Sequence, residues 1–190
     1  TDRDYQRFPV NDIARWVIQS NNSTTFATPI HNHGLHGTGQ LVTVGDTGID
    51  YAHEMFFDPS MPIPPTSTPP PSQPQHRKVT AYYVPPNAGG DSTDNAPDDH
   101  GTHTSGTVAG DAGTWHLYDG SPEGSSGIVG PHDGQAFDAT IQVQDLSTDG
   151  TSIDPPDIWD DMFEPAIAAG SFIHTNSWGA CCPFRYHTFS

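Results

Sequence analysis

The alternation of hydrophobic and polar positions along the chain predicts short strands separated by helices. Residues 39–48 form an apolar, β-branched run between glycines, which is typical of a buried strand. Residues 79–84 and 140–146 show short strand patterns, and residues 171–178 predict a fourth strand. Strands that alternate with helices along the sequence predict an α/β fold built on a parallel sheet.

Two helices are predicted at the start and in the middle of the chain. A short amphipathic helix covers Asn11–Gln19. Its apolar residues lie on one side: Ile13, Trp16 and Val17. An acidic, glycine-rich loop over residues 87–99 leads into a second helix, which begins at His100 and ends near Gly110. His100 is therefore expected in the first turn of a helix.

Prolines define two further segments. Residues 58–75 contain eight prolines, a composition that excludes helix and central strand and predicts an exposed insertion loop. Asp154 is followed by Pro155 and Pro156, which predicts the start of a third helix with Asp154 as its cap. This helix should run to about Ala169, before a glycine.

The charge balance limits the classes of partner. The 190 residues include 23 acidic and 6 basic side chains, for a formal charge of −17. Such a field repels a phosphate backbone, so we expect no nucleic-acid partner. No apolar run reaches the ~20 residues that a membrane span needs, so we expect no membrane partner. The charge suits an extracellular setting, and we predict a secreted protein.

Two short motifs carry the candidate chemistry. The first strand ends in Asp46-Thr47-Gly48, and the second helix begins with His100-Gly101-Thr102-His103. Catalytic groups in open α/β sheets gather at the carboxyl ends of the strands, where Asp46 falls. A carboxylate that orients a histidine, and a histidine that accepts a hydroxyl proton, are two parts of a nucleophilic triad. Asp46 and His100 suit those two roles.

These motifs resemble the aspartate and histidine segments of the subtilisin-like serine proteases, in that family's chain order of Asp, His and Ser. Ser177-Trp178-Gly179 resembles the family's substrate-binding strand, closest to alkaline bacterial members related to the kexin-like branch. The resemblance assigns residues 1–190 to the N-terminal portion of a catalytic domain. It implies a three-layer α/β fold with a mainly parallel sheet, incomplete in this chain, and endopeptidase activity on polypeptides.

The resemblance also implies roles for individual residues. Asp46 would be the orienting carboxylate and His100 the general base. Ser177, Trp178 and Gly179 would bind the substrate, because a peptide can pair with the main chain of such a strand. In this interpretation Trp178 contributes to the walls of the S1 and S4 pockets.

Three further positions follow from the same interpretation. Leu146 and Gly150 would belong to the opposite edge of the substrate cleft. His103 lies one turn after His100 and is expected to pack beneath the site without a role in proton transfer.

The family's nucleophile and oxyanion asparagine do not follow the substrate-binding segment. Residues 150–155 imitate the nucleophile motif, but they precede Ser177, whereas the family's serine comes long after that strand. We therefore do not assign Ser152 as the nucleophile. A C-terminal segment of the same protease, missing from this chain or separate from it, is the expected partner that carries the serine. The chain alone is predicted to be inactive.

No cofactor is required for this chemistry, and no metal ligand is assigned. Calcium is expected only as a structural ion, for which the acidic loops 87–99 and 145–161 offer oxygen ligands. Met55 stands where many members of the family have a calcium-binding aspartate, so that particular calcium site is not predicted.

Two alternatives compete with the protease hypothesis. A subtilase-derived chain without a nucleophile could act as a non-catalytic structural or binding component of a larger assembly. A metal-dependent hydrolase is the lesser alternative, because two groups of closely spaced histidines could supply imidazole ligands. These groups are His31, His33 and His36, and the pair His100 and His103.

Overall fold

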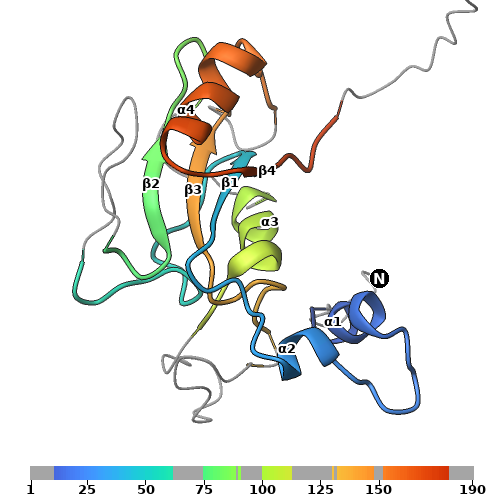
Figure 1. Cartoon of the computed structure of the whole chain (residues 1–190). Coiled ribbons are helices and arrows are strands. Elements are labelled where there is room, and N and C mark those ends of the chain that lie inside the picture. Colours follow the sequence, from blue (N-terminus) through green and yellow to red (C-terminus); the bar gives the residue numbers. More distant parts are fainter. Residues whose placement is uncertain are drawn as a thin grey trace, which may run out of the picture.

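The structure, a computed structural model, describes residues 11–61, 75–88, 90, 100–112, 130, 132–147 and 152–179. Its centre is a four-stranded sheet in the order β2-β3-β1-β4 (Figure 1). The strands are β1 (Leu41–Asp46), β2 (Val79–Tyr83), β3 (Thr140–Asp145) and β4 (Ile173–Thr175). All neighbouring strands are parallel, which confirms the predicted α/β fold.

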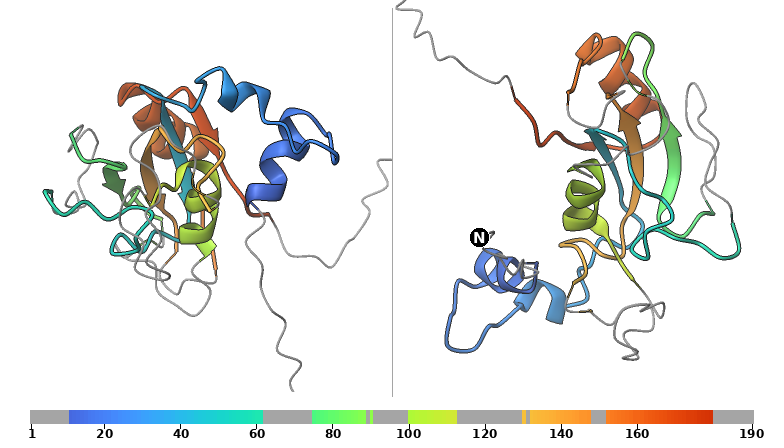
Figure 2. Two further views of the ribbon diagram at one scale, coloured as in Figure 1. Left: turned by 90° about the horizontal axis from the view of Figure 1, so that it is seen from below. Right: turned by 180° about the vertical axis from the view of Figure 1, so that it is seen from behind.

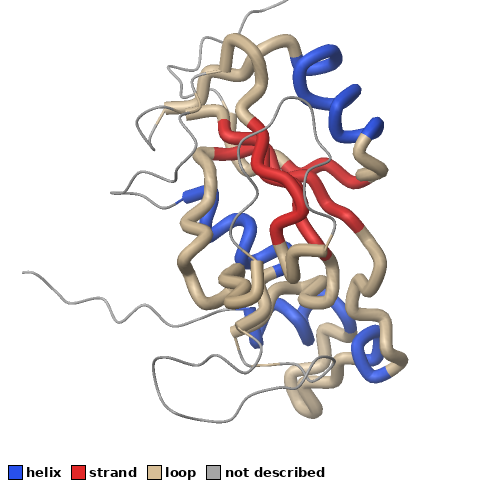
Figure 3. The backbone as a smooth tube through the Cα atoms, turned by 90° about the vertical axis from the view of Figure 1, so that its left-hand side faces the viewer, coloured by secondary structure: helices blue, strands red, loops and turns tan. Residues whose placement is uncertain are grey.

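Helices cover both faces of this sheet. Helix α3 (His100–Ala109) lies on one face, and the π-helical turn η1 (Ile158–Phe163) with α4 (Glu164–Ala168) lies on the other (Figure 2). Helices α1 (Asn11–Gln19) and α2 (Pro29–Asn32) lie beside this three-layer unit, near the lower end of α3 in Figure 1. Figure 3 shows the twisted strands between the helical layers.

The face of the sheet beneath α3 is apolar. Val42 and Val44 of β1 point to this face, and Ile141 and Val143 lie beside them on β3, in agreement with the parallel register. All four side chains are at most 5% exposed, and Ala109 of α3 packs against them. Burial of this apolar area is the main stabilising contribution to the α3 side of the fold.

The opposite face of the sheet is polar where it meets η1. Thr43, Gln142 and Gln144 lie on this face and are fully buried. The amide Nε2 of Gln144 donates to the carbonyl oxygen of Met162 in η1 at 2.8 Å. Because buried polar groups are costly unless they are hydrogen-bonded, such contacts specify how η1 docks on the sheet.

The third helix starts later than the sequence predicts. Asp157, and not Asp154, caps it, and the Asp157 carboxylate accepts hydrogen bonds from the amides of Trp159 and Asp160. Residues 152–157 have no regular secondary structure, because a residue before proline avoids the helical region. Pro165 explains the wide π turn, since it has no amide N–H for a regular helical bond.

Helix α1 has the predicted bounds but does not dock through its apolar side. Ile13 and Val17 are 49% and 43% exposed, whereas Arg15 is buried. The Arg15 guanidinium donates to the carbonyl oxygens of Gly130 and Asp133 at 2.8 and 3.1 Å. A buried arginine bound to backbone carbonyls therefore attaches α1 to the domain.

Strand β4 is shorter than predicted: it has three residues instead of the eight expected over residues 171–178, all of which the structure describes. Of the proline-rich loop, residues 58–61 and 75 are described, and residues 62–74 lie outside the described ranges. No helix in the described part of the chain is long and apolar enough to cross a membrane.

Candidate active site

Asp46 and His100 meet at the carboxyl end of β1. Asp46 is the last residue of β1, and His100 is the first residue of α3. The Nδ1 atom of His100 lies 2.7 Å from Oδ1 of Asp46. A carboxylate can only accept, so Nδ1 carries the proton and donates it to Asp46. The two residues are brought together from 54 positions apart, as the sequence predicts.

The motif residues beside this pair connect β1 to α3. The amide of Gly101 donates to Oγ1 of Thr47 at 2.9 Å, and the amide of Asp50 donates to Oγ1 of Thr102 at 2.7 Å. A Cβ atom at Gly101 would lie 2.1 Å from the carbonyl oxygen of Gly48. Only glycine at position 101 allows α3 to approach the turn that follows Asp46 this closely.

Burial differs sharply between the two partners. The Asp46 side chain is fully buried, while 45% of the His100 side chain is exposed. Asp46 Oδ1 also accepts from the amide of Thr47 at 2.8 Å, and Oδ2 has no hydrogen-bond partner among the described residues. The carboxylate is thus fixed in orientation, and the His100 side chain is partly open to solvent. This arrangement can accept a proton at Nε2 and stabilise the resulting imidazolium.

The predicted substrate-binding segment follows β4 and is anchored to β1. Ser177 and Gly179 are exposed, and a Cβ at Gly179 would meet nothing within 4 Å. Trp178 is half-buried, and its indole Nε1 donates to the carbonyl oxygen of Gly45 at 2.7 Å. Because Gly45 directly precedes Asp46, the structure brings this segment to the main chain beside the Asp46–His100 pair.

A hydrogen-bonded chain of side chains, not predicted from the sequence, lies next to this segment. Asn176 Nδ2 donates to His174 Nδ1 at 3.1 Å, and His174 Nε2 donates to Gln144 Oε1 at 2.9 Å. Burial lowers the pKa of His174 to about 4, so this imidazole is neutral at pH 7. The sequence gives no signal for these hydrogen bonds, because Asn176, His174 and Gln144 come together only when β3, β4 and η1 pack.

Other predicted positions have different outcomes. Leu146 is fully buried, so its side chain belongs to the core and offers no surface to a peptide. Gly150 lies outside the described residues. His103 is exposed and does not pack beneath the site as predicted. Ser152 is exposed in the irregular segment that precedes η1.

The closely spaced histidines of the N-terminal segment bind backbone carbonyls. His31 Nε2 donates to Gln135 O at 2.9 Å, and His33 Nδ1 donates to Pro29 O at 2.6 Å. His36 Nε2 contacts the carbonyl oxygen of His31 at 2.8 Å, and its Nδ1 lies 3.3 Å from Asp138. Within the described ranges, no three His, Cys, Asp or Glu side chains converge on a position that could hold a metal ion.

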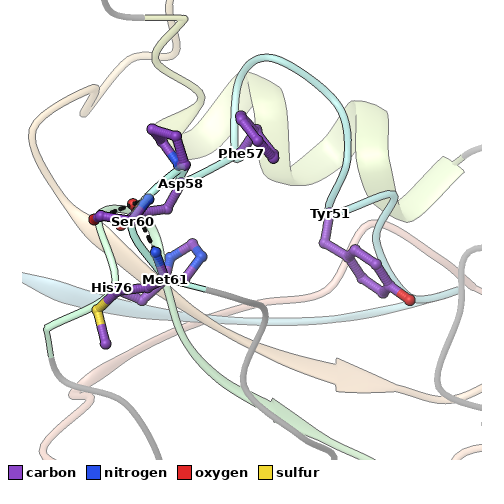
Figure 4. Close-up of a pocket in the computed structure, with 7 residues that line it drawn as sticks. Tyr51, Phe57, Asp58, Ser60, Met61 and His76 are labelled. Atoms are coloured by element: carbon purple, nitrogen blue, oxygen red, sulfur yellow. Dashed lines mark hydrogen bonds between the residues drawn. The ribbon is translucent and has the colours of Figure 1, made fainter.

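A separate pocket of about 330 Å³ lies beside the turn at Asp58 (Figure 4). Its walls are largely apolar, and its lining residues are Tyr51, Phe57, Asp58, Pro59, Ser60, Met61 and His76. The amides of Lys78 and Val79 both donate to His76 Nδ1, so the proton of the neutral ring is on Nε2. None of these lining residues belongs to the Asp46–His100 pair.

Comparison with known proteins agrees with this geometry. The sequence model described as "Subtilase family" matches residues 37–188. Two Dictyostelium discoideum proteins, each named "Serine protease/ABC transporter B family protein", are similar to the chain. These are tagB, with 33% identity over 146 residues, and tagD, with 35% identity over 150 residues. Each match covers 77% of this chain but 7% of the relative's length. The chain belongs to the subtilase family.

Proposed function

We propose that this chain supplies the carboxylate and the general base of a serine endopeptidase triad. The observation that carries the proposal is the 2.7 Å hydrogen bond between His100 Nδ1 and Asp46 Oδ1, at the carboxyl end of β1. With Nδ1 protonated, the unprotonated Nε2 of His100 is the atom that can take a proton. Membership of the subtilase family supports the same chemistry.

The proposed reaction begins when a serine hydroxyl loses its proton to His100 Nε2 and attacks the carbonyl carbon of the scissile peptide bond. The imidazolium then protonates the leaving amine, and the peptide C–N bond breaks to give an acyl-enzyme. Water then loses a proton to His100 and attacks the acyl carbon, the ester C–O bond breaks, and the imidazolium returns its proton to the serine oxygen. Asp46 remains ionised and stabilises the imidazolium throughout.

The remaining parts of the site are proposed from the resemblance and from exposure. Ser177 and Gly179 are exposed and can offer main-chain groups to a bound peptide by strand addition. We assign the nucleophile to a serine on a C-terminal segment of the same protease. The relation to the kexin-like branch is proposed from the sequence of residues 173–180.

The proposed setting of the reaction follows from two properties. The formal charge of −17 suits secretion, and we retain an extracellular location as a proposal. The relatives' names combine a serine protease with an ABC transporter, and the chain spans 7% of their length. We propose that the region they share with this chain is protease sequence, because it falls largely within the subtilase match.

The test is to replace Asp46 by Asn in the full-length protein. This change preserves the size of the side chain but lets it donate to His100, which favours the wrong tautomer. We expect kcat on peptide substrates to fall about 10⁴-fold. The matched control is Asp138→Asn, because Asp138 also lies against a histidine, His36, at 3.3 Å. Activity of the control should stay within about twofold of the wild type.

The alternatives predict other outcomes. A non-catalytic component would show no hydrolysis and no fluorophosphonate labelling in the full-length wild-type protein. A metal-dependent hydrolase would lose activity with chelators and keep it with serine reagents. Either result, or full activity in Asp46→Asn, would contradict the triad proposal. In the same assay, residues 1–190 alone should take up no fluorophosphonate label, and labelling at Ser152 would overturn our assignment of the nucleophile.

A further inference from the structure

Strand β4 is short, and side chains on either side of it contact carbonyl oxygens of β1. The ladder pairs Val42 with Ile173 and ends at Val44 with Thr175. Before the ladder, Ser171 Oγ lies 3.1 Å from Leu41 O and 3.0 Å from Ile173 O, and its one hydroxyl proton is shared between them. One β1 carbonyl, Leu41 O, is therefore within reach of a side-chain hydroxyl before the ladder begins.

At the other end, the indole of Trp178 takes the place of a ladder amide. Carbonyl oxygens of a strand point alternately to its two neighbours. Asp46 O accepts from Leu146 N on the β3 side, so Gly45 O points to the β4 side. A longer β4 would satisfy Gly45 O with a backbone N–H, but Trp178 Nε1 donates to it at 2.7 Å instead. The backbone of residues 177–179 is therefore not part of the ladder with β1, while the Trp178 side chain keeps this segment next to β1.

Asn176, which precedes the peptide-binding segment, is held by the side-chain hydrogen bonds to His174 and Gln144 on the η1 face of the sheet. Asn176 is bonded to His174, which is bonded in turn to Gln144. A Cβ at Gly45 would lie 2.8 Å from Asn176 Oδ1 and 3.2 Å from His174 Cε1. Gly45 thus allows Asn176 to pack against β1, and the segment is fixed on both sides of Ser177.

We propose that Trp178 is a positioning residue, whose indole N–H anchors the peptide-binding segment 177–179 to Gly45 beside Asp46. The inference rests on the proposed function, and it differs from the expected role of Trp178 as a pocket wall. Asp46 itself is held independently, since it pairs with Asp145 of β3 and accepts from Thr47 and His100. Loss of the indole bond should therefore weaken peptide binding more than it slows the chemical step.

The test is Trp178→Phe in the full-length protein, which retains an aromatic ring and removes the N–H donor. We expect KM for peptide substrates to rise about fivefold to tenfold, as loss of one hydrogen bond implies, with kcat within about twofold. Trp159→Phe is the matched control, because Trp159 is 62% exposed on η1. Its kinetic constants should not change.

Hydrogen–deuterium exchange gives a second readout that does not depend on catalysis. Trp178→Phe should increase deuterium uptake in peptides that cover residues 173–179, and Trp159→Phe should not. An unchanged KM, or a fall in kcat at constant KM, would overturn the positioning role, as would unchanged uptake. If the wild-type protein hydrolyses no peptide, the proposed function fails, and the exchange result still decides whether the indole anchors this segment.

Discussion

His100 and His174 lie on opposite faces of the same sheet and have opposite hydrogen-bonding patterns. His100 donates from Nδ1 to the buried Asp46 carboxylate, and its side chain is 45% exposed. His174 donates from Nε2 to the Gln144 amide oxygen and accepts at Nδ1 from Asn176. Both nitrogens of His174 are thus occupied by neutral groups. Among the described residues, Nε2 of His100 has no such partner.

The difference shows how the surroundings of an imidazole determine its chemistry. Because Nδ1 of His100 donates to a carboxylate, the lone pair of the neutral ring is on Nε2, which can accept a proton during a reaction. Among the described residues, no carboxylate influences His174, and burial lowers its pKa to about 4. His174 is consequently a structural residue at neutral pH, and His100 is a candidate base. The predictions below act on each side of this comparison.

The largest effect is expected where α3 meets the Asp46 loop. In Gly101→Ala the new Cβ would lie 2.1 Å from Gly48 O, a backbone atom that cannot move without displacing the loop. We expect the free energy of unfolding to fall by about 2–3 kcal/mol, with loss of activity because His100 moves away from Asp46. Chemical denaturation and peptide hydrolysis measure the two effects.

Gly106→Ala is the matched control on the same helix. A Cβ at Gly106 would have Phe56 Cζ as its nearest contact, at 3.9 Å. This change should leave activity intact and should not lower stability, since alanine favours helix over glycine. Equal destabilisation by the two substitutions would contradict the close approach of α3 to β1.

A smaller effect is expected from the protonation of His174. In the unfolded chain His174 has its ordinary pKa of 6.5, so it takes up a proton below pH 6.5. In the folded protein its pKa is about 4, so it stays neutral down to about pH 4. The free energy of unfolding is therefore at its full value with respect to His174 above pH 6.5. It falls as the pH decreases from 6.5 to 4, because the unfolded chain binds the proton more readily. We expect a contribution of about 3 kcal/mol across this window, measured by urea denaturation at several pH values.

Substitution separates this contribution from that of the other histidines. His174→Gln should remove this part of the pH dependence, whereas His103→Gln, at an exposed position on α3, should leave it unchanged. If the pH dependence of His174→Gln is the same as that of the wild type, His174 is not the buried neutral group described here.

The sequence predicts best where local signals are strong. The Asp46 and His100 motifs gave the correct element ends, because an apolar run ending in aspartate and a glycine-rich helix start are local features. Local patterns also predict α1 at Asn11–Gln19, but they do not indicate how it attaches to the domain. Arg15 binds carbonyl oxygens that lie more than 100 positions away in the sequence, and periodicity cannot indicate such partners.

Non-local packing also limits what the sequence predicts of the candidate site. Leu146 is expected from the sequence at the opposite edge of the cleft, and tertiary packing buries its side chain completely. The roles of Gly45 and His174 depend on β1, β4 and η1 meeting, so no single stretch of sequence encodes them. Trp178 was correctly placed near the site, yet its indole contacts Gly45 of β1.

The tautomer of His100 tests the central claim most directly. Nitrogen-15 NMR of the imidazole groups, recorded over a pH series, distinguishes a protonated from an unprotonated ring nitrogen. Our account predicts that neutral His100 carries its proton on Nδ1 and takes up the second on Nε2, while His174 carries its proton on Nε2. A neutral His100 with its proton on Nε2 would contradict the hydrogen bond to Asp46 and, with it, the assignment of His100 as the base.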